Sequence, residues 1–330
     1  MSSFPFDLLD HSHPILVFGR DGQIGKALQV CLSDLKVPVV YLGRADCDLT
    51  DRVALNEILS RHQPQLIINA AAYTAVDKAE TEREHAFAIN AQAPALMARY
   101  ISQVPHGVLI HYSTDYVFAD TKKTPYFETD ITGPINQLSF YGQTKLAGEE
   151  AIKEAFNLAG DSGRRRGQEA FSRYFILRTS WVYGDGNNFI RTILRLAAER
   201  DQLKVVADQV GAPTSAQWLA EVSLEVAQSR VESGIYHVVP DGETSWHGLA
   251  VFAIETAASY GEGVEVKSEN ILPITTQEYP VAAQRPLNSH LSNQKLKKVL
   301  TEMAYTTPYP RWQDQVEQYV KDYVAAALKS

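Results

Sequence analysis

The sequence predicts an α/β protein with a doubly wound parallel sheet, followed by a smaller C-terminal α/β region. Short apolar runs alternate with helical patterns through the first half of the chain, which favours a parallel sheet buried on both faces. A glycine-rich turn, Gly19 to Gly25, follows the first apolar run and opens the first helical pattern. The length of 330 residues fits about two domains at ~150 residues each.

The elements of the first half follow one another in strand–helix order. Pro38 interrupts the start of the second strand, and Asp51 or Thr50 can cap the second helix. Crossovers between parallel strands are right-handed, so this order predicts the doubly wound arrangement. We expect strands at 15–18, 37–42, 66–69 and 108–111, and helices at 23–32, 53–61, 79–90 and 93–103.

The second half opens with a helix that continues to about residue 158, and a polar, glycine-rich loop is expected at 159–168. Beyond Asn188 short strand patterns alternate with longer helical ones, and prolines mark turns in the tail. We expect strands at 175–177, 203–206 and 235–239, and helices at 189–200, 215–228, 247–259 and 312–328.

Composition and charge narrow the class of protein. The hydrophobic share of 45% is ordinary for a globular chain, and the formal net charge of -8 offers no basic excess for a nucleic acid. Cys31 and Cys47 are the only cysteines, so we expect no disulfide framework and a reducing compartment. No apolar run approaches the ~18 residues of a membrane-spanning helix, and residues 1–14 lack the pattern of an export signal. These features predict a cytoplasmic protein without a membrane or nucleic-acid partner.

Glycines at positions 19, 22 and 25 form a GxxGxxG turn between the first strand and the first helix. Glycine permits the tight turn and lets the backbone approach a pyrophosphate, while the helix N-terminus presents free N–H groups to that anion. After the first strand of an alternating pattern, such a turn indicates a dinucleotide-binding Rossmann fold. Arg44 ends the second strand, where an acid would bind the ribose 2′-hydroxyl, so we expect NADPH, with NADH as the alternative.

Tyr141 and Lys145 form a Tyr-x-x-x-Lys motif in a helical segment. Residues four apart share one face of a helix, and a nearby ammonium lowers the pKa of a phenol, which makes it usable as an acid or base. Thr114 closes the fourth strand, and ligands of doubly wound sheets lie beyond the carboxyl ends of the strands. We therefore expect Thr114 and Tyr141 to reach the same carbonyl oxygen.

Further segments resemble one family over nearly the whole chain from Ile15 onward. They are Asn69-Ala-Ala-Ala-Tyr-Thr-Ala-Val-Asp-Lys-Ala-Glu80, His111-Tyr-Ser-Thr-Asp-Tyr-Val-Phe118, Tyr141-Gly-Gln-Thr-Lys-Leu-Ala-Gly-Glu149, Arg178-Thr-Ser-Trp-Val-Tyr183, Gly186-Asn-Asn-Phe189, Asp208-Gln-Val-Gly-Ala-Pro-Thr214 and Arg285-Pro-Leu-Asn-Ser289. With the GxxGxxG turn, they make the chain similar to the dTDP-4-dehydrorhamnose reductases, within the extended short-chain dehydrogenase/reductases. The Thr-Ala-Val-Asp stretch favours this family over sugar-nucleotide epimerases.

The resemblance implies the last step of dTDP-rhamnose biosynthesis. NAD(P)H would deliver a hydride to C4 of dTDP-4-dehydro-β-L-rhamnose and give dTDP-β-L-rhamnose. By the same resemblance, Tyr141 would donate the proton, Lys145 would bind the nicotinamide ribose and lower the pKa of Tyr141, and Thr114 would orient the carbonyl. Donors placed where charge develops are the ones that assist such a step.

The resemblance also implies binding residues. On the cofactor side they are Gly19, Gly22, Gln23, Ile24, Gly25, Arg44, Asp48, Leu49, Ala70, Ala71, Ala72, Tyr141 and Lys145. On the substrate side they are Thr74, Val76, Asp115, Tyr116, Trp181 and Arg285, with Arg285 expected near the diphosphate. Some members of the family dimerise through a metal held by acids, but Gln217 stands where a glutamate is expected, so we predict no required metal.

Two alternative functions remain open at this point. A relative of this fold is a non-catalytic, NADP-binding regulatory subunit of methionine adenosyltransferase, and another possibility is a reductase of a related dTDP-4-keto-6-deoxy sugar. The resemblance leaves a homodimer open as well.

The expected domains are a tail at 1–14, an NAD(P)-binding Rossmann domain at 15–187 to which 209–239 returns, and a substrate-binding domain made of 188–208 and 240–330.

Overall fold

A six-stranded parallel sheet forms the centre of the computed structural model, which describes residues 13–120, 122–165, 172–229, 231–261, 266, 268–303 and 309–327. The strands lie in the order β10-β5-β4-β3-β1-β2, and every neighbouring pair is parallel. Their bounds are β1 Ile15–Phe18, β2 Val39–Leu42, β3 Leu66–Asn69, β4 Val108–Thr114, β5 Arg173–Thr179 and β10 Gly234–His237. The order reverses next to β1, as the doubly wound prediction requires.

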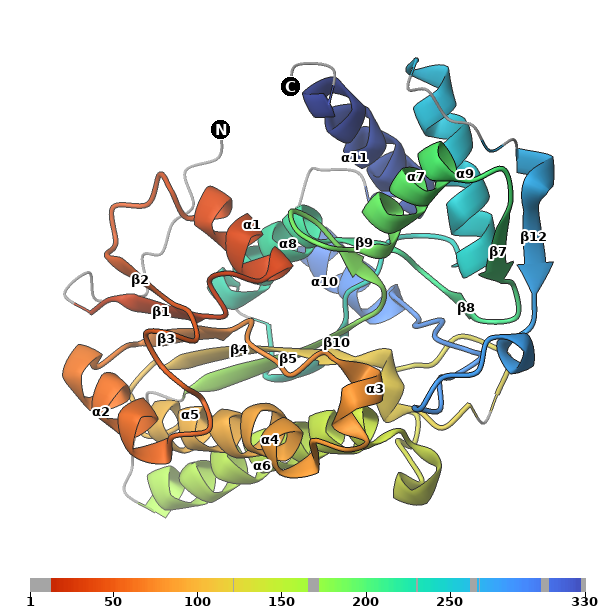
Figure 1. Cartoon of the computed structure of the whole chain (residues 1–330). Helices are drawn as coiled ribbons and strands as arrows, with labels where there is room; N and C mark the ends of the chain where they lie inside the picture. Colours follow the sequence, from red (N-terminus) through yellow and green to blue (C-terminus); the bar gives the residue numbers. More distant parts are fainter. Residues whose placement is uncertain are drawn as a thin grey trace.

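Helices cover both faces of this sheet (Figure 1). One face carries α1 (Gln23–Cys31), α8 (Ala216–Gln228) and α10 (Gln294–Glu302), and the other carries α2 (Arg52–His62), α5 (Ala93–Ile101) and α6 (Phe140–Arg165). The predicted cap of the second helix is confirmed, because the Asp51 carboxylate accepts from the N–H groups of Val53 and Ala54. The Rossmann-like fold class predicted from the sequence is confirmed.

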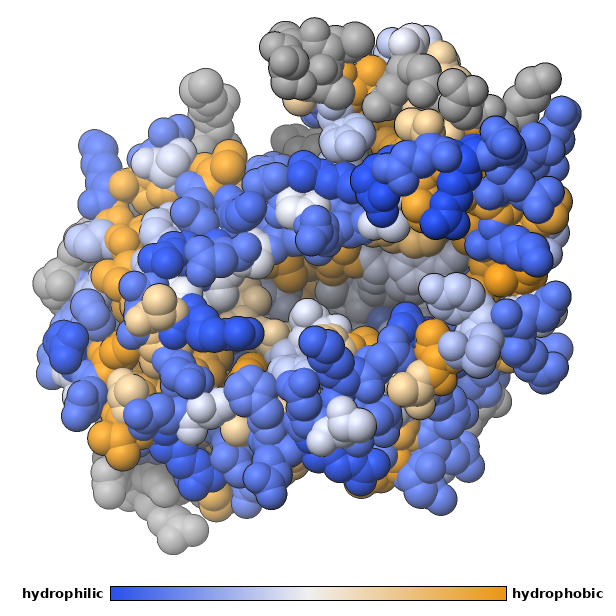
Figure 2. Space-filling view, in the orientation of Figure 1, coloured by the Kyte–Doolittle hydropathy of each residue, from blue (hydrophilic) through white to orange (hydrophobic). Residues whose placement is uncertain are grey.

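The C-terminal helices form a second layer beside the sheet. They are α7 (Phe189–Glu199), α9 (Trp246–Ser259) and α11 (Trp312–Ala327), and they pack with the parallel pair β7 (Leu203–Val206) and β12 (Ile271–Ile274) around a separate apolar cluster. Between these helices and the large sheet, the face seen in Figure 2 is hollowed. No helix in the described parts of the chain is long and apolar enough to span a membrane.

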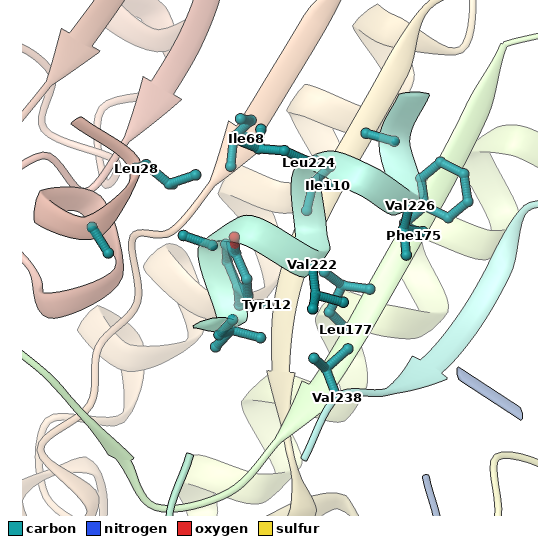
Figure 3. Close-up of a cluster of buried hydrophobic side chains, with 14 of the residues drawn as sticks. Leu28, Ile68, Ile110, Tyr112, Phe175, Leu177, Val222, Leu224, Val226 and Val238 are labelled. Carbon is teal, nitrogen blue, oxygen red and sulfur yellow. The ribbon is translucent and has the colours of Figure 1, made fainter. Parts of the chain in front are cut away.

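The core on the α8 face shows how the later part of the chain returns to the sheet. Val222 and Val226 of α8 lie against Phe175 and Leu177 of β5, which is a neighbour of β4 (Figure 3). Leu296 of α10 belongs to the same cluster, although the sequence assigns 240–330 to the second domain. Helix α10 therefore packs with the large sheet, and the division into two domains stays a prediction.

Short elements connect these layers. They are α3 (Val76–Ala79), α4 (Arg83–Phe87), the π-helical turn η1 (Ala88–Gln92), the 3-10 turns η2 (Asp115–Val117), η3 (Ile135–Gln137), η4 (Ser268–Asn270) and η5 (Thr276–Glu278), and the strands β6 (Val182–Tyr183), β8 (Val210–Gly211), β9 (Thr214–Ser215) and β11 (Thr244–Ser245). Strand β6 pairs with β9, and β8 pairs with β11.

Two expected elements differ in the structure. The single helix expected at 79–90 is divided: α3 ends at Ala79, α4 begins at Arg83, and the π turn η1 follows α4 directly. Within η1 the Asn90 side chain binds the backbone N–H and carbonyl of Tyr73. The loop expected at 159–168 is helical as far as Arg165, and residues 166–168 lie outside the described residues. Gly160 is tolerated within α6 because a helical glycine costs only about 1 kcal/mol relative to alanine.

Candidate active site

A cleft of about 890 Å³ opens at the carboxyl ends of the sheet strands, beneath the second layer. The predicted cofactor residues Gly19, Gly22, Gln23, Ile24, Arg44, Asp48, Leu49, Ala70, Ala71 and Ala72 line it. The predicted catalytic residues Thr114, Tyr141 and Lys145 and the substrate-side residues Thr74, Val76, Asp115, Tyr116 and Trp181 line the same cleft. Gly25 and Arg285 are the two predicted site residues that do not.

The glycine turn is built by close backbone packing. Gly19 has a φ of +88°, and a Cβ at this position would lie 2.6 Å from the backbone of Ala70. A Cβ on Gly25 would lie 2.0 Å from the Gly19 carbonyl oxygen. Gly25 therefore lets α1 pack against the turn, whereas Gly22 stands at the helix N-terminus and faces the cleft.

Thr114, Tyr141 and Lys145 converge from two elements. Thr114 ends β4, and Tyr141 and Lys145 lie one turn apart in α6. The Thr114 hydroxyl donates to Asp115 Oδ1 at 3.1 Å and is hydrogen-bonded with the Tyr141 phenol. The Tyr116 ring meets the Tyr141 ring edge-on at a centroid distance of 5.5 Å. The hydroxyl groups of Thr114 and Tyr141 can therefore both form hydrogen bonds with one ligand oxygen atom in the cleft.

Burial, rather than Lys145, dominates the pKa of Tyr141. Desolvation raises the pKa of the Tyr141 phenol above its ordinary value, and only the Thr114 hydrogen bond lowers it. That Lys145 lowers the pKa of Tyr141 stays a prediction, and in this structure Lys145 Nζ donates to the Tyr112 carbonyl at 2.7 Å. Burial lowers the pKa of Lys145 to about 8. A phenol with a raised pKa holds its proton, which is the state that a proton donor needs.

Asp115 is a buried acid next to this group. Burial raises the pKa of Asp115 to about 6, opposed by hydrogen bonds with Ser289 and Thr114. Asp115 is 2% exposed, and burial therefore keeps a share of this carboxyl protonated near pH 6.

An aromatic wall closes the far side of the cleft. Trp181 has a φ of +48°, which is strained for a bulky residue, and its ring stacks on Trp246 at a centroid distance of 3.8 Å. The Trp246 indole donates to Gln209 Oε1 at 3.1 Å, which fixes its orientation. A Cβ on Gly211 would lie 2.8 Å from Trp181 Cε2, so the backbone at Gly211 approaches this ring closely. Trp181 thus has close neighbours in both Gly211 and Trp246.

Sequence reasoning missed some residues that line the cleft. Trp246, Asp185 and Asn187 face it, and none was expected to do so. Asn187 belongs to the Gly186-Asn-Asn-Phe189 segment, so its position could have been found from the motif. Trp246 comes from α9, outside every motif, and only the three-dimensional packing reveals it.

Arg285 does not line the cleft but contacts residues at its edge. Its guanidinium pairs with Asp77 at 2.7 Å and is hydrogen-bonded with Tyr116, a residue that does line the cleft. An acid one residue after Val76 thus holds the arginine at the edge of the substrate side. Its contact with a diphosphate stays a prediction.

A buried ion pair supports the strand that carries Thr114. Arg178 of β5 makes two hydrogen bonds to Glu149 of α6, at 2.9 Å and 2.6 Å, and the Ser113 hydroxyl donates to the same carboxylate at 2.5 Å. Arg178 is 2% exposed and Glu149 is 0% exposed. The pair joins α6, which carries Tyr141, to the sheet.

No group of three or more His, Cys, Asp or Glu side chains suited to a metal ion occurs among the described residues. Gln217 stands where the family resemblance led us to expect a glutamate, and its side-chain amide donates to Glu221 at 2.9 Å. The prediction that no metal is required remains untested.

A Rossmann sheet, a glycine turn at its first strand and a Thr–Tyr–Lys set at the strand ends define an oxidoreductase of the short-chain dehydrogenase/reductase class. The family described as RmlD substrate binding domain matches residues 13–325. A dTDP-4-dehydrorhamnose reductase of Burkholderia thailandensis is 39% identical over 94% of this chain and 99% of its own length. One of Escherichia coli is 39% identical over 93% of this chain and 97% of its own. The chain belongs to the dTDP-4-dehydrorhamnose reductase family.

Solved structures agree with this assignment. A dTDP-4-dehydrorhamnose reductase of Bacillus anthracis, solved in complex with NADP, has a TM-score of 0.76 and 32% identity, covering 93% of this chain and 98% of that one. A UDP-glucose 4-epimerase of Thermus thermophilus, solved with NAD, has a TM-score of 0.71 over 95% of this chain and 99% of that one, at 18% identity. The second likeness concerns the fold alone.

Proposed function

We propose that this protein reduces dTDP-4-dehydro-β-L-rhamnose to dTDP-β-L-rhamnose with NADPH, as the last step of dTDP-rhamnose biosynthesis in the cytoplasm. The observation that carries the proposal is the meeting of Thr114, Tyr141 and Lys145 in one cleft with the glycine turn. The family membership supports the substrate, and the NADP bound by the Bacillus anthracis relative supports the cofactor. NADH is the alternative donor.

The residues of the cleft fit a dinucleotide. Ala70, Ala71 and Ala72 offer small side chains where a ribose would pass, and Gly22 leaves the N-terminus of α1 open to a pyrophosphate. Gln23 Oε1 is buried without a hydrogen-bond partner, so it can accept from an amide or hydroxyl of the ligand. When bound, NADPH supplies the hydride.

The proton in this mechanism comes from Tyr141. As C4 of the sugar accepts the hydride, the carbonyl π electrons move onto its oxygen, and the Tyr141 O–H bond breaks to protonate that oxygen. Thr114 orients the same oxygen by its hydroxyl, and the Lys145 ammonium stabilises the phenolate that remains. The raised pKa of Tyr141 supports this direction, because the phenol is protonated before the step.

The decisive test is turnover of the dTDP-keto sugar with NADPH and with NADH, with the product identified by NMR. We expect dTDP-β-L-rhamnose and oxidised cofactor in equal amounts. Binding of NADPH without any turnover would instead favour a regulatory subunit of the methionine adenosyltransferase type. A product with the other configuration at C4 would assign the protein to a related dTDP-4-keto-6-deoxy sugar.

The choice between the two cofactors is expected to depend on Arg44. Its guanidinium lines the cleft next to the turn that carries Gly43, and a guanidinium suits a 2′-phosphate. Arg44→Ala should raise the KM for NADPH roughly tenfold, the loss of about 1.4 kcal/mol, with little change for NADH. Arg61→Ala, at the exposed end of α2, is the matched control and should change neither value. Equal effects of Arg44→Ala on both cofactors would show that Arg44 does not bind the 2′-phosphate.

The aromatic wall gives a second test, now on the sugar side. Gly211→Ala places a methyl group against Trp181 and should displace its ring, so we expect KM for the dTDP-sugar to rise about tenfold or more while Kd for NADPH stays the same. Steady-state kinetics and tryptophan fluorescence measure the two effects. Gly160→Ala is the control, because a Cβ there meets nothing within 4 Å. An unchanged sugar KM would exclude Trp181 from the substrate side.

A homodimer and a substrate-binding domain made of 188–208 and 240–330 remain parts of the proposal. The separate apolar cluster of α7, α9 and α11 supports such a domain, and Trp246 of α9 would contribute its side of the sugar pocket.

A further inference from the structure

A buried row of hydrogen-bonding side chains leads to Lys145, and its middle member, His111, has no part in the proton transfer described for Tyr141. Asn69 ends β3 and lies in register with His111 of β4. Asn69 Nδ2 is 3.0 Å from His111 Nδ1, and His111 Nε2 is 3.2 Å from Lys145 Nζ. Each of the three side chains is 1% exposed.

The backbone fixes which way the Asn69 amide points. Asn69 Oδ1 accepts from the N–H of Ala71 at 3.2 Å, and Ala71 belongs to the segment that lines the cofactor side of the cleft. The opposite orientation would bring the amide NH₂ against another donor. The NH₂ group therefore faces His111 Nδ1 and donates to it, so Nδ1 has no proton and the ring proton of the neutral imidazole is on Nε2.

This tautomer has a consequence for Lys145. The Nε2–H of His111 is directed at Lys145 Nζ, and an ammonium group has donors only. Two donors cannot satisfy each other, whereas a neutral amine can accept from His111 and still donate to the Tyr112 carbonyl at 2.7 Å. The hydrogen-bond directions thus favour the neutral amine.

We propose that His111 is a positioning residue for Lys145: held by Asn69 with its proton on Nε2, it shifts the balance of Lys145 from ammonium toward neutral amine. The inference rests on the proposed function, in which the charged form of Lys145 stabilises the Tyr141 phenolate. The Asn69–His111–Lys145 row also connects the protonation state of Lys145 to the backbone that lines the cofactor side of the cleft, because Asn69 accepts from the N–H of Ala71.

The other titratable groups around Lys145 differ in their effect on its pKa. Glu149, one turn further along α6, raises the pKa of Lys145, but it is already paired with Arg178 of β5. Tyr141, one turn back, is uncharged while its pKa is raised. His111 itself stays neutral, because burial and the charge of Lys145 hold its pKa well below the ordinary value. Lys145 is therefore the group of this row that titrates near neutral pH, with a pKa of about 8.

The first experiment reads the tautomer directly and needs no turnover. In protein labelled with ¹⁵N-histidine, long-range proton–nitrogen correlation spectra distinguish a protonated ring nitrogen from a bare one. We expect His111 to show the Nε2–H form unchanged from pH 6 to pH 9. Its signals are assigned by their loss in His111→Gln, or, if that variant does not fold, as the buried non-titrating ring that remains in His237→Gln. An Nδ1–H form would overturn the proposal, whatever the activity.

The second experiment reverses the tautomer. In Asn69→Asp a carboxylate faces Nδ1, so the ring proton should move to Nδ1 and the bare Nε2 should accept from the ammonium. Because activity falls as pH rises through the pKa of Lys145, the basic limb of the kcat profile should move up by one pH unit or more.

A double variant with His111→Leu separates the effect of the new negative charge from the effect of the His111 tautomer. A new carboxylate at position 69 attracts an ammonium even without His111, so the same substitution is made in the His111→Leu background. We expect less than a third of the shift there, since the tautomer is then absent. A full shift of the basic limb without His111 would overturn the proposal. If the unmodified protein shows no turnover at all, the proposed function is overturned, and the NMR result then decides on His111.

Discussion

Tyr141→Phe should lower kcat by ~100-fold or more, which is the scale of general acid catalysis, while Kd for NADPH changes little. The phenylalanine ring fills the same partly buried space beside Thr114 and Tyr116, so the loss is confined to one hydroxyl group. Without that hydroxyl, the oxygen at C4 must take its proton from water or from a weaker donor. Single-turnover oxidation of NADPH, followed at saturating sugar, measures the effect on the chemical step.

Tyr73→Phe provides a matched control for this substitution. Tyr73 is a buried tyrosine between two residues that line the cleft, and its hydroxyl donates to Glu82 at 2.8 Å. Removing that hydroxyl should leave kcat within about threefold of the unmodified protein, because only a partly buried hydrogen bond is lost. Near-normal turnover by Tyr141→Phe would exclude Tyr141 as the proton donor.

Glu149→Gln should reduce the free energy of unfolding by about 3–5 kcal/mol, because it leaves the buried Arg178 guanidinium without its counter-charge. Both hydrogen bonds from Arg178 end on this carboxylate, and the Ser113 hydroxyl ends there too. A loss of that size is a large fraction of the ~5–15 kcal/mol that stabilises a typical domain. Urea unfolding followed by circular dichroism measures it.

Two comparisons test whether the loss in free energy of unfolding depends on the burial of the ion pair. The exposed pair Arg195 and Glu199 joins the same residue types at 2.9 Å on the surface of α7, and Glu199→Gln should cost less than ~1 kcal/mol. Replacing both buried partners, by Glu149→Leu with Arg178→Met, should restore part of the stability that Glu149→Gln loses, since no unpaired charge remains. Equal losses for the buried and exposed pairs would contradict this account.

The sequence was most informative where local pattern and tertiary packing agree. The first strand is confirmed at Ile15–Phe18 because four apolar residues end in a glycine turn, and the Asp51 cap is confirmed because it depends on neighbouring residues only. The π turn of η1 could not be predicted in this way. At this turn Asn90 Oδ1 accepts a hydrogen bond from the backbone N–H of Tyr73, a non-local contact that no periodicity reveals.

The same distinction applies to the cleft. Thr114, Tyr141 and Lys145 could be grouped from the sequence because strand ends and helix faces follow simple geometry. The raised pKa of Tyr141 could not, since it depends on burial. Nor could the position of Arg285, whose partner Asp77 is more than two hundred residues away along the chain.

The return of the chain to the large sheet limits how this protein can be recombined with its relatives. Strand β10 and helices α8 and α10 complete the sheet and its cover, although they follow α7 and β7 of the second layer. A chimaera with a single crossover after residue 187 would take its edge strand and two covering helices from the other parent. An exchange of sugar preference that keeps the cofactor half intact therefore needs at least two separate inserts, one on each side of the returning segment.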